Sequence, residues 1–146
     1  MYVIDASVHV ADMRPSEPHH AEARAFFRRV AGERKPVYLP AIILPEVAAA
    51  ISRGTGEPAL ALRLTAAMQR IPHFEIVPID QDLGRLAAAL AADHQIRGCD
   101  AVYVALAQER GARLITLDRQ QRGRVPASVV ARSPAEELSE IGDAER

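Results

Sequence analysis

Short apolar runs alternate with longer segments of helical periodicity along the whole chain. The short runs are rich in β-branched residues and are bounded by proline, glycine or charged residues, a pattern typical of buried strands. They predict strands at residues 2–4, 37–39, 74–79 and 113–117, and a short last strand at 128–131. The pattern therefore favours a sheet of four to five strands.

Apolar residues at helical spacing fill the segments between these runs. They predict helices at residues 7–13, 20–30, 46–53, 58–71, 81–95 and 100–109. Ser7 is the predicted N-cap of the first helix, Gly32 the end of the second, and Pro45 the lead into the third. Because strands alternate with helices, the chain is predicted to adopt an α/β fold with a mostly parallel sheet.

Length and composition indicate a single globular domain. A chain of 146 residues can bury a core of its own, and we assign the domain to residues 1–138 and a frayed tail to 139–146. The single cysteine, Cys99, excludes an internal disulfide and a cysteine zinc cluster. No apolar run approaches the roughly 20 residues of a membrane span, and no signal peptide is visible, so a cytoplasmic location is expected.

Charge alone does not indicate a nucleic-acid binder. Lys+Arg 18 and Asp+Glu 19 leave a formal net charge of -1. A role in binding RNA or DNA must therefore rest on local groups of side chains. Lys35 is the single lysine of the chain, so chemistry that needs a catalytic lysine has one candidate.

Four acidic residues lie at the ends of apolar elements. Asp5 and Asp118 each end an apolar run, Glu46 follows an apolar stretch, and Asp100 opens an apolar helical segment. The carboxyl ends of parallel strands meet at the edge of a sheet where ligands bind. Four carboxylates gathered there repel one another, and a hard divalent cation such as Mg²⁺ or Mn²⁺ relieves that repulsion.

Each of these acids also has an ordinary structural role open to it. An acid at a helix start is usually a cap, and an acid after a strand is usually a turn residue. The four acids together favour a metal site more than any one of them does alone, because a hydroxyl residue lies two positions from two of them. Ser7 is two positions from Asp5, and Thr116 is two positions from Asp118. Such hydroxyls can orient a carboxylate or a bound water. Spacing alone leaves a metal site and a set of caps as equal alternatives.

Four motifs in this order resemble those of the PIN domain family, and among its members the VapC-type toxins of toxin–antitoxin pairs. They are Ile4-Asp5-Ala6-Ser7-Val8, Pro45-Glu46-Val47, the segment from Arg97 to Ala107, and Ile115-Thr116-Leu117-Asp118-Arg119. The third motif is the most specific, and the resemblance covers the chain from about Met1 to Leu138. It implies a three-layer α/β/α sandwich around a central parallel sheet.

The resemblance also implies an activity and partners. It implies an endoribonuclease that uses one or two Mg²⁺ or Mn²⁺ ions, held by Asp5, Glu46, Asp100 and Asp118, with Ser7 and Thr116 supporting the carboxylates. It further implies a homodimer and a cognate antitoxin that covers the acidic groove. Two departures from the family pattern, His9 in the first helix and Gln120-Gln121 after the last acid, bear on substrate range.

Several arginines flank the predicted site. Arg14, Arg119, Arg122 and Arg124 are candidates to hold RNA phosphates, against the alternative that each is a solvated surface residue.

Other functional classes remain open at this point. A catalytically weak PIN-like module that binds RNA or protein is the main alternative to a ribonuclease. A phospho-acceptor enzyme also places an acid after its first strand, but it needs a lysine near the phosphoryl group, and Lys35 is predicted at the opposite edge of the sheet. A Ser7, His9 and acid triad lacks the nucleophile-elbow context of a hydrolase.

Overall fold

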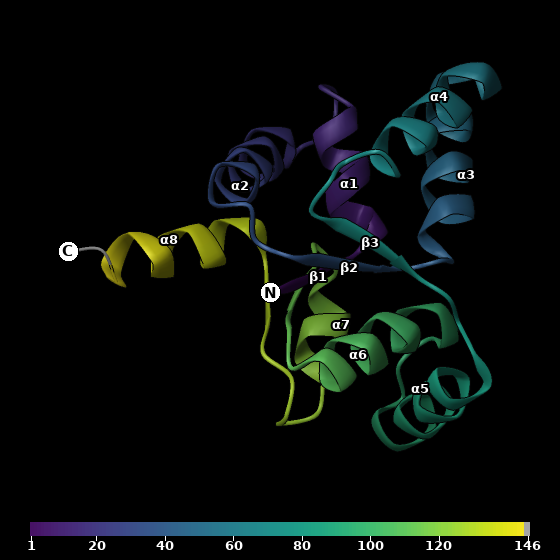
Figure 1. The fold of residues 1–146 in the computed structure, drawn as a ribbon, viewed down its shortest axis with the longest axis vertical. Coiled ribbons are helices and arrows are strands. Elements are labelled where there is room, and N and C mark those ends of the chain that lie inside the picture. The colour runs from purple at the N-terminus through teal and green to yellow at the C-terminus, as the bar shows by residue number, and fades with distance from the viewer. Residues whose placement is uncertain (145–146) are drawn as a thin grey trace.

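Five parallel strands form the central sheet of the protein, shown in Figure 1. The computed structural model describes residues 1–144. The strand order is β3-β2-β1-β4-β5, and every neighbouring pair is parallel. The bounds are β1 Tyr2–Ile4, β2 Val37–Pro40, β3 Phe74–Val77, β4 Arg113–Ile115 and β5 Ala131–Arg132. The predicted α/β fold with a parallel sheet is confirmed.

Helices cover both faces of this sheet (Figure 1). On one face lie α1 Ala6–Met13, α2 His20–Glu33, α3 Ile43–Thr55 and α4 Pro58–Met68. On the other face lie α5 Gln81–His94, α6 Gly98–Arg110 and α7 Arg119–Arg124. The last helix, α8 Pro134–Ala144, packs beside α2. Within residues 1–144, no helix has both the length and the hydropathy to span a bilayer.

The core is built around β1 and α6. All three residues of β1 are buried, as the central strand of a sheet covered on both faces requires. In α6 the residues from Ala101 to Ala107 are buried without interruption, because the helix lies between the sheet and α5. A helix that is apolar on all sides is stable only in such a position. Its burial fixes the first turn of α6, where Asp100 lies.

Three local predictions need correction. Ser7 does not cap α1, because the N-cap position is Asp5 and no side-chain cap bond forms there. The second helix continues past Gly32 to Glu33, and its C-cap is Arg34, which adopts a left-handed conformation with φ of 50°. Backbone bonds from Arg34 and Lys35 back to the last turn hold this end. The tail expected from about Ser139 is helical as far as Ala144, while residues 145–146 lie outside the described part of the chain.

Candidate active site

All four predicted acids line one groove of about 840 Å³ at the carboxyl edge of the sheet. Asp5 follows β1, Asp118 follows β4, and Glu46 lies in the first turn of α3 after β2. Asp100 lies in the first turn of α6. Because α6 leads into β4, its C-terminus lies at the amino end of that strand and its N-terminus at the carboxyl edge. The groove thus lies where the strand order reverses around β1, the usual position of ligand sites in such sheets.

Asp5 is the most buried acid of the groove, with 6% of its surface exposed. The hydroxyls of Thr116 and Ser7 each donate a hydrogen bond of 2.8 Å to its Oδ2. Burial raises the pKa of Asp5, the two hydroxyl bonds act against that rise, and the nearby charge of Asp100 adds to it. The carboxylate is therefore held in one orientation and is destabilised in its charged form unless a cation approaches.

The two hydroxyls also connect Asp5 to the end of β4. Thr116 Oγ1 accepts a bond of 3.1 Å from the backbone N–H of Asp118, and Ser7 Oγ accepts one of 3.2 Å from that of Leu117. Thr116 is fully buried, so this link lies inside the protein. Asp5 and Asp118 are consequently positioned by one shared set of bonds.

Glu46 is linked to the core through Tyr103. The phenol of Tyr103, which is buried in α6, donates a hydrogen bond to Glu46 Oε2. Burial raises the pKa of Glu46, the Tyr103 bond opposes the rise, and the charges of Asp5 and Asp100 add to it. Burial and the bond to Glu46 also raise the pKa of Tyr103, which stays a donor. No pattern in the sequence indicates this contact, since the two residues are 57 positions apart.

Arg97 was not among the predicted site residues, although it opens the third motif. Its Nε donates to Asp100 Oδ2 and its Nη2 to Asp118 Oδ2, both at 2.7 Å. Bonding to Asp100 and the charges of Asp100 and Asp118 raise the pKa of the guanidinium. The available signal was its position three residues before Asp100 at a helix start, a spacing that brings two side chains together.

Asp118 has a structural role as well as a place in the groove. Its Oδ1 caps α7 by accepting from the backbone N–H groups of Gln120 at 2.8 Å and Gln121 at 3.1 Å. Its Oδ2 faces Arg97. Capping the next helix, an ordinary role of an acid after a strand, thus uses Oδ1 of Asp118 and leaves Oδ2 for the groove.

The donor set of the groove fits a hard divalent cation. Carboxylate and hydroxyl oxygens are the ligands that Mg²⁺ and Mn²⁺ prefer. Among residues 1–144, no three acidic, histidine or cysteine side chains are arranged as a finished metal cluster. In the groove, Arg97 donates to Asp100 and Asp118, and Tyr103 donates to Glu46. Arg97 is 71% exposed in its side chain, so it can turn away without disturbing the core.

Three of the four arginines predicted to contact RNA make bonds within the protein, and Arg14 and Arg122 do so at the rim of the site. Arg14 pairs with Glu17 at 2.6 Å and donates to the carbonyl of Gly54 at 3.2 Å, which ties the end of α1 to α3. Arg122 donates to the carbonyl of Thr116 at 2.9 Å. These bonds give both side chains a structural role at the rim of the site.

The groove is lined by different arginines. Arg53 and Arg97 contribute to its walls. Of the predicted candidates, Arg124 donates to the carbonyl of Gln95, and Arg119 is exposed on α7 next to Asp118. The role of Arg119 as a phosphate contact stays a prediction, and Arg53 and Arg97 are the arginines that line the groove.

Two rival interpretations find no support in this geometry. Lys35 precedes β2, so it lies at the amino edge of the sheet, opposite to the edge that carries the acids. It pairs with Glu33 at 2.8 Å. His9 does not contact Ser7: within residues 1–144 its Nε2 has no hydrogen-bond partner, and the ring lines a different cavity. A phospho-acceptor site and a serine triad are both incompatible with these positions.

Comparisons with known proteins agree with the fold and the motifs. The model of the PIN domain family matches residues 2–124. A stretch of 43 residues is 51% identical to Ribonuclease VapC3 of Pyrobaculum aerophilum, and it covers 30% of this chain and 33% of that protein. The chain thus matches about a third of the length of this relative.

Solved structures share the whole architecture at low identity. The toxin VapC20 of Mycobacterium tuberculosis, described as cleaving the sarcin-ricin loop, superposes with a TM-score of 0.72 at 18% identity, over 89% of this chain and 99% of that one. FitAcB of Neisseria gonorrhoeae gives 0.70 at 22% identity, over 92% and 99%. VapBC2 of Rickettsia felis, solved on a fragment of its promoter DNA, gives 0.69 at 14% identity, over 90% and 97%.

Proposed function

Because the chain belongs to the PIN domain family, we propose that it is a Mg²⁺- or Mn²⁺-dependent endoribonuclease, and the toxin of a toxin–antitoxin pair. The observation that carries the proposal is the convergence of Asp5, Glu46, Asp100 and Asp118 on one groove from four separate segments. The sequence similarity to a protein named as a ribonuclease and the structural similarity to toxins support the same activity.

Asp5, Asp100 and Asp118 would hold the cation, and Glu46 would act beside it. Asp5 and Asp100 line the groove together, and Asp118 offers the oxygen that does not cap α7. When bound, a divalent cation supplies positive charge against the scissile phosphate and makes a water more acidic. The hydroxyls of Ser7 and Thr116 keep the Asp5 carboxylate in a fixed orientation throughout.

Glu46 is the group that orients the attacking water. Tyr103 holds its Oε2, so the other oxygen is the one available to accept a proton from the nucleophile. The raised pKa of Glu46, caused first by burial, makes the carboxylate a better proton acceptor than an exposed one. In-line attack of water on phosphorus then breaks the bond to the 3′ oxygen, which takes up a proton from solvent, so that a 5′-phosphate and a 3′-hydroxyl are left.

Arg97 and Arg53 bind the RNA backbone. Both line the groove, and Arg97 is exposed enough to exchange its carboxylate partners for a phosphate of the substrate. Arg119, next to Asp118, extends this positive edge. Phosphate contacts of this kind position the strand without reading its sequence.

A cleavage assay on total bacterial RNA in Mn²⁺, with the cut sites mapped by sequencing, tests the activity. Asp100→Asn is expected to lower the rate at least about a hundredfold, because it removes an oxygen charge from the cation site. Asp82→Asn is the matched control, since Asp82 is an exposed acid on α5 and should leave the rate unchanged. Equal rates for wild type and Asp100→Asn would refute the assignment and favour an RNA- or protein-binding module.

The toxin role concerns partners as well as chemistry. Structures similar to this chain include a toxin–antitoxin complex from Klebsiella pneumoniae and VapBC from Salmonella typhimurium bound to DNA. By analogy this chain binds an antitoxin that covers the acidic groove in the cytoplasm, and it forms a homodimer in which the exposed Leu62 of α4 is a candidate contact. Co-purification with the product of the neighbouring reading frame, and light scattering of the free chain, test the two associations separately.

A further inference from the structure

A small hollow of about 190 Å³ lies directly beside the acidic groove. The side chains of His19 and Leu117 line both the groove and the small hollow, so the two adjoin. Leu117 immediately precedes Asp118, whose Oδ2 faces the groove. The small hollow therefore begins next to the acids that would hold the cation.

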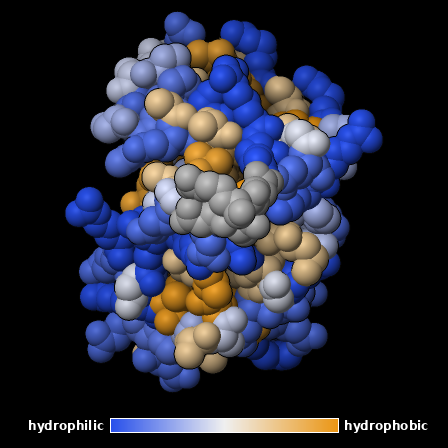
Figure 2. All heavy atoms as spheres, turned by 90° about the vertical axis from the view of Figure 1, so that its left-hand side faces the viewer, coloured by the Kyte–Doolittle hydropathy of each residue, from blue (hydrophilic) through white to orange (hydrophobic). Residues whose placement is uncertain are grey.

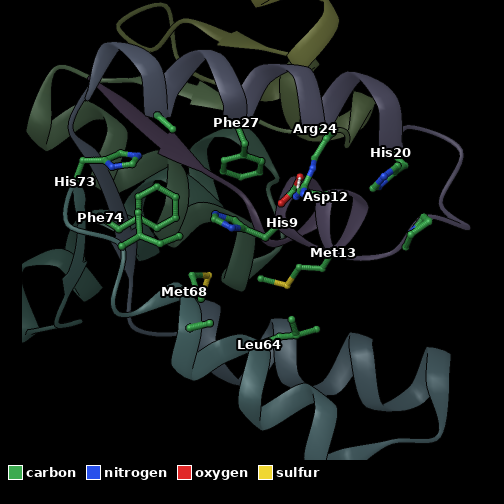
Figure 3. A pocket seen from close by; sticks show the side chains of 14 residues that line it. His9, Asp12, Met13, His20, Arg24, Phe27, Leu64, Met68, His73 and Phe74 are labelled. Carbon is green, nitrogen blue, oxygen red and sulfur yellow. Dashed lines mark hydrogen bonds and ion pairs between the residues drawn. The ribbon is translucent and has the colours of Figure 1, made fainter.

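The larger cavity that Figure 3 shows, of about 660 Å³ among α1, α2 and α4, has no such connection. Within residues 1–144, none of the side chains that line it also lines the acidic groove. Its wall includes the buried His9, and burial lowers the pKa of this imidazole to about 3. The acidic groove thus extends toward the small hollow and not toward this cavity.

Helices α7 and α8 build most of the small hollow. Helix α7 contributes Arg119 and Arg122, and the start of α8 contributes residues 133–136. Glu137, which is fully buried and ion-paired, fixes α8 in place. The wall made by α8 lies beyond residues 2–124, the part of the chain that the PIN domain model matches. Membership of the family therefore does not specify this wall.

Arg119 is the unpaired charge of the small hollow. Its side chain is exposed, and in the described part of the chain it forms no hydrogen bond or ion pair. The two acids that line the hollow do have partners. Glu22 bonds to Nδ1 of His19 at 2.8 Å, and Glu136 pairs with a second cation, Arg122, at 3.7 Å. One positive charge is therefore left for a ligand.

We propose that the small hollow binds the phosphate of a nucleotide that flanks the scissile bond, with Arg119 as its contact and α8 as its outer wall. This inference rests on the proposed nuclease function of the groove. A guanidinium without a partner in the protein can form two parallel hydrogen bonds to a phosphate without first breaking an ion pair. The hollow is smaller than the roughly 300–1,000 Å³ of pockets for whole small molecules, so it suits one phosphate of a chain that continues from the groove.

Binding of a fluorescently labelled single-stranded RNA in EDTA, followed by anisotropy at several salt concentrations, counts the phosphate contacts. Loss of one contact to a single strand makes the slope of log K against log salt shallower by about 0.7. Arg119→Gln is expected to show this loss, whereas Arg85→Gln, on α5 at the other end of the sheet in Figure 1, should keep the wild-type slope. An unchanged slope in Arg119→Gln, or no binding of RNA by wild type, would overturn the proposal.

Ala135→Glu tests the part that α8 plays. It adds a negative charge to the wall of the small hollow, in the first turn of a helix, where an acid does not disturb the fold. RNA binding is expected to weaken about fivefold, because the new charge repels the phosphate. Ala89→Glu makes the same change at an exposed position of α5 and is the control. Equal RNA affinities of these two variants would overturn the proposed place of binding.

Cleavage of one RNA and of a series of shortened forms separates the flanking site from the nuclease function. On the full-length RNA, Ala135→Glu is expected to lower kcat/KM about fivefold, and this defect should vanish once the nucleotide that occupies the small hollow is removed. A defect that persists at every length would overturn the flanking site and leave the nuclease function standing. RNA that binds with the expected salt slopes but is not cleaved by wild type would support the flanking site and refute the nuclease function alone.

Discussion

Arg97 bridges two acids that belong to separate motifs, one at the start of α6 and one after β4. Its guanidinium lies between two carboxylates that otherwise repel each other, a place where positive charge is favourable. Because the side chain is largely exposed, each ion pair is weak and reversible. Arg97 can therefore neutralise Asp100 and Asp118 and then move away from them when a cation binds in the groove.

Arg97→Gln is expected to tighten Mn²⁺ binding about fivefold, since two exposed ion pairs of together about 1 kcal/mol no longer compete with the ion. Electron paramagnetic resonance of free Mn²⁺ during titration measures the dissociation constant. Arg85→Gln is the control, because Arg85 forms a similar i,i+3 pair with Asp82 away from the groove. Weaker Mn²⁺ binding in Arg97→Gln would show that Arg97 does not compete with the cation.

His9 is expected to make the protein sensitive to mild acid. Its pKa is about 3 when folded and 6.5 as the ordinary value. Below pH 6.5 the unfolded chain therefore binds a proton that the folded chain does not, and stability falls as the pH falls toward 3. The slope approaches about 1.4 kcal/mol per pH unit.

Urea unfolding of wild type and His9→Leu between pH 7 and pH 4 measures this effect. The variant is expected to be at least as stable at pH 7, and its advantage should grow steadily below pH 6.5. His19→Leu, which changes an exposed imidazole, should show no such trend. A constant difference between His9→Leu and wild type across the range would contradict a buried neutral His9.

At the scale of elements, α8 shows how a helix at the end of the fold is attached. Glu137 is fully buried and pairs with Arg113 at 2.7 Å and Arg132 at 3.3 Å. Tyr2 of the central strand donates to it at 2.9 Å. One carboxylate thus joins α8 to β1, β4 and β5, and the hydroxyl of Tyr2 keeps a raised pKa because of burial and this bond.

Glu137→Ala is expected to lower the free energy of unfolding by about 3 kcal/mol, because it leaves two arginines without their shared buried partner. Chemical denaturation monitored by circular dichroism gives the value. Glu140→Ala, on an exposed position of the same helix that also faces Arg113 and Arg132, should cost less than about 1 kcal/mol. Equal losses of unfolding free energy in the two variants would mean that the burial of Glu137 adds nothing to stability.

The sequence contained a signal for α8 that periodicity alone did not reveal. Ser133 and Glu136 form a capping box, with bonds of 2.7 Å and 3.2 Å between their backbone N–H groups and side chains. Pro134 then occupies the first turn, as the motif favours. By contrast, α7 is six residues long, too short for a periodic pattern, and it forms because Asp118 caps it.

For the whole molecule, topology turns separate motifs into one site. The fold class and the edge on which the acids lie were predictable, because parallel strands place their carboxyl ends together. The contacts of Arg97 and Tyr103 with the acids were not, since they depend on how α6 is rotated against the sheet. Figure 2 shows one face of the molecule, on which hydrophilic side chains surround smaller apolar patches.

Metal removal and return tests the proposed nuclease site as a whole. Protein treated with EDTA and then titrated with Mn²⁺ is assayed for cleavage of total RNA, in wild type and in Asp5→Asn. Wild type should be inactive without metal and regain cleavage as Mn²⁺ is added, whereas Asp5→Asn should stay inactive while keeping its fold by circular dichroism. Cleavage by the metal-free wild type, or recovery of Asp5→Asn to the wild-type rate, would contradict a cation-dependent nuclease site built on these four acids.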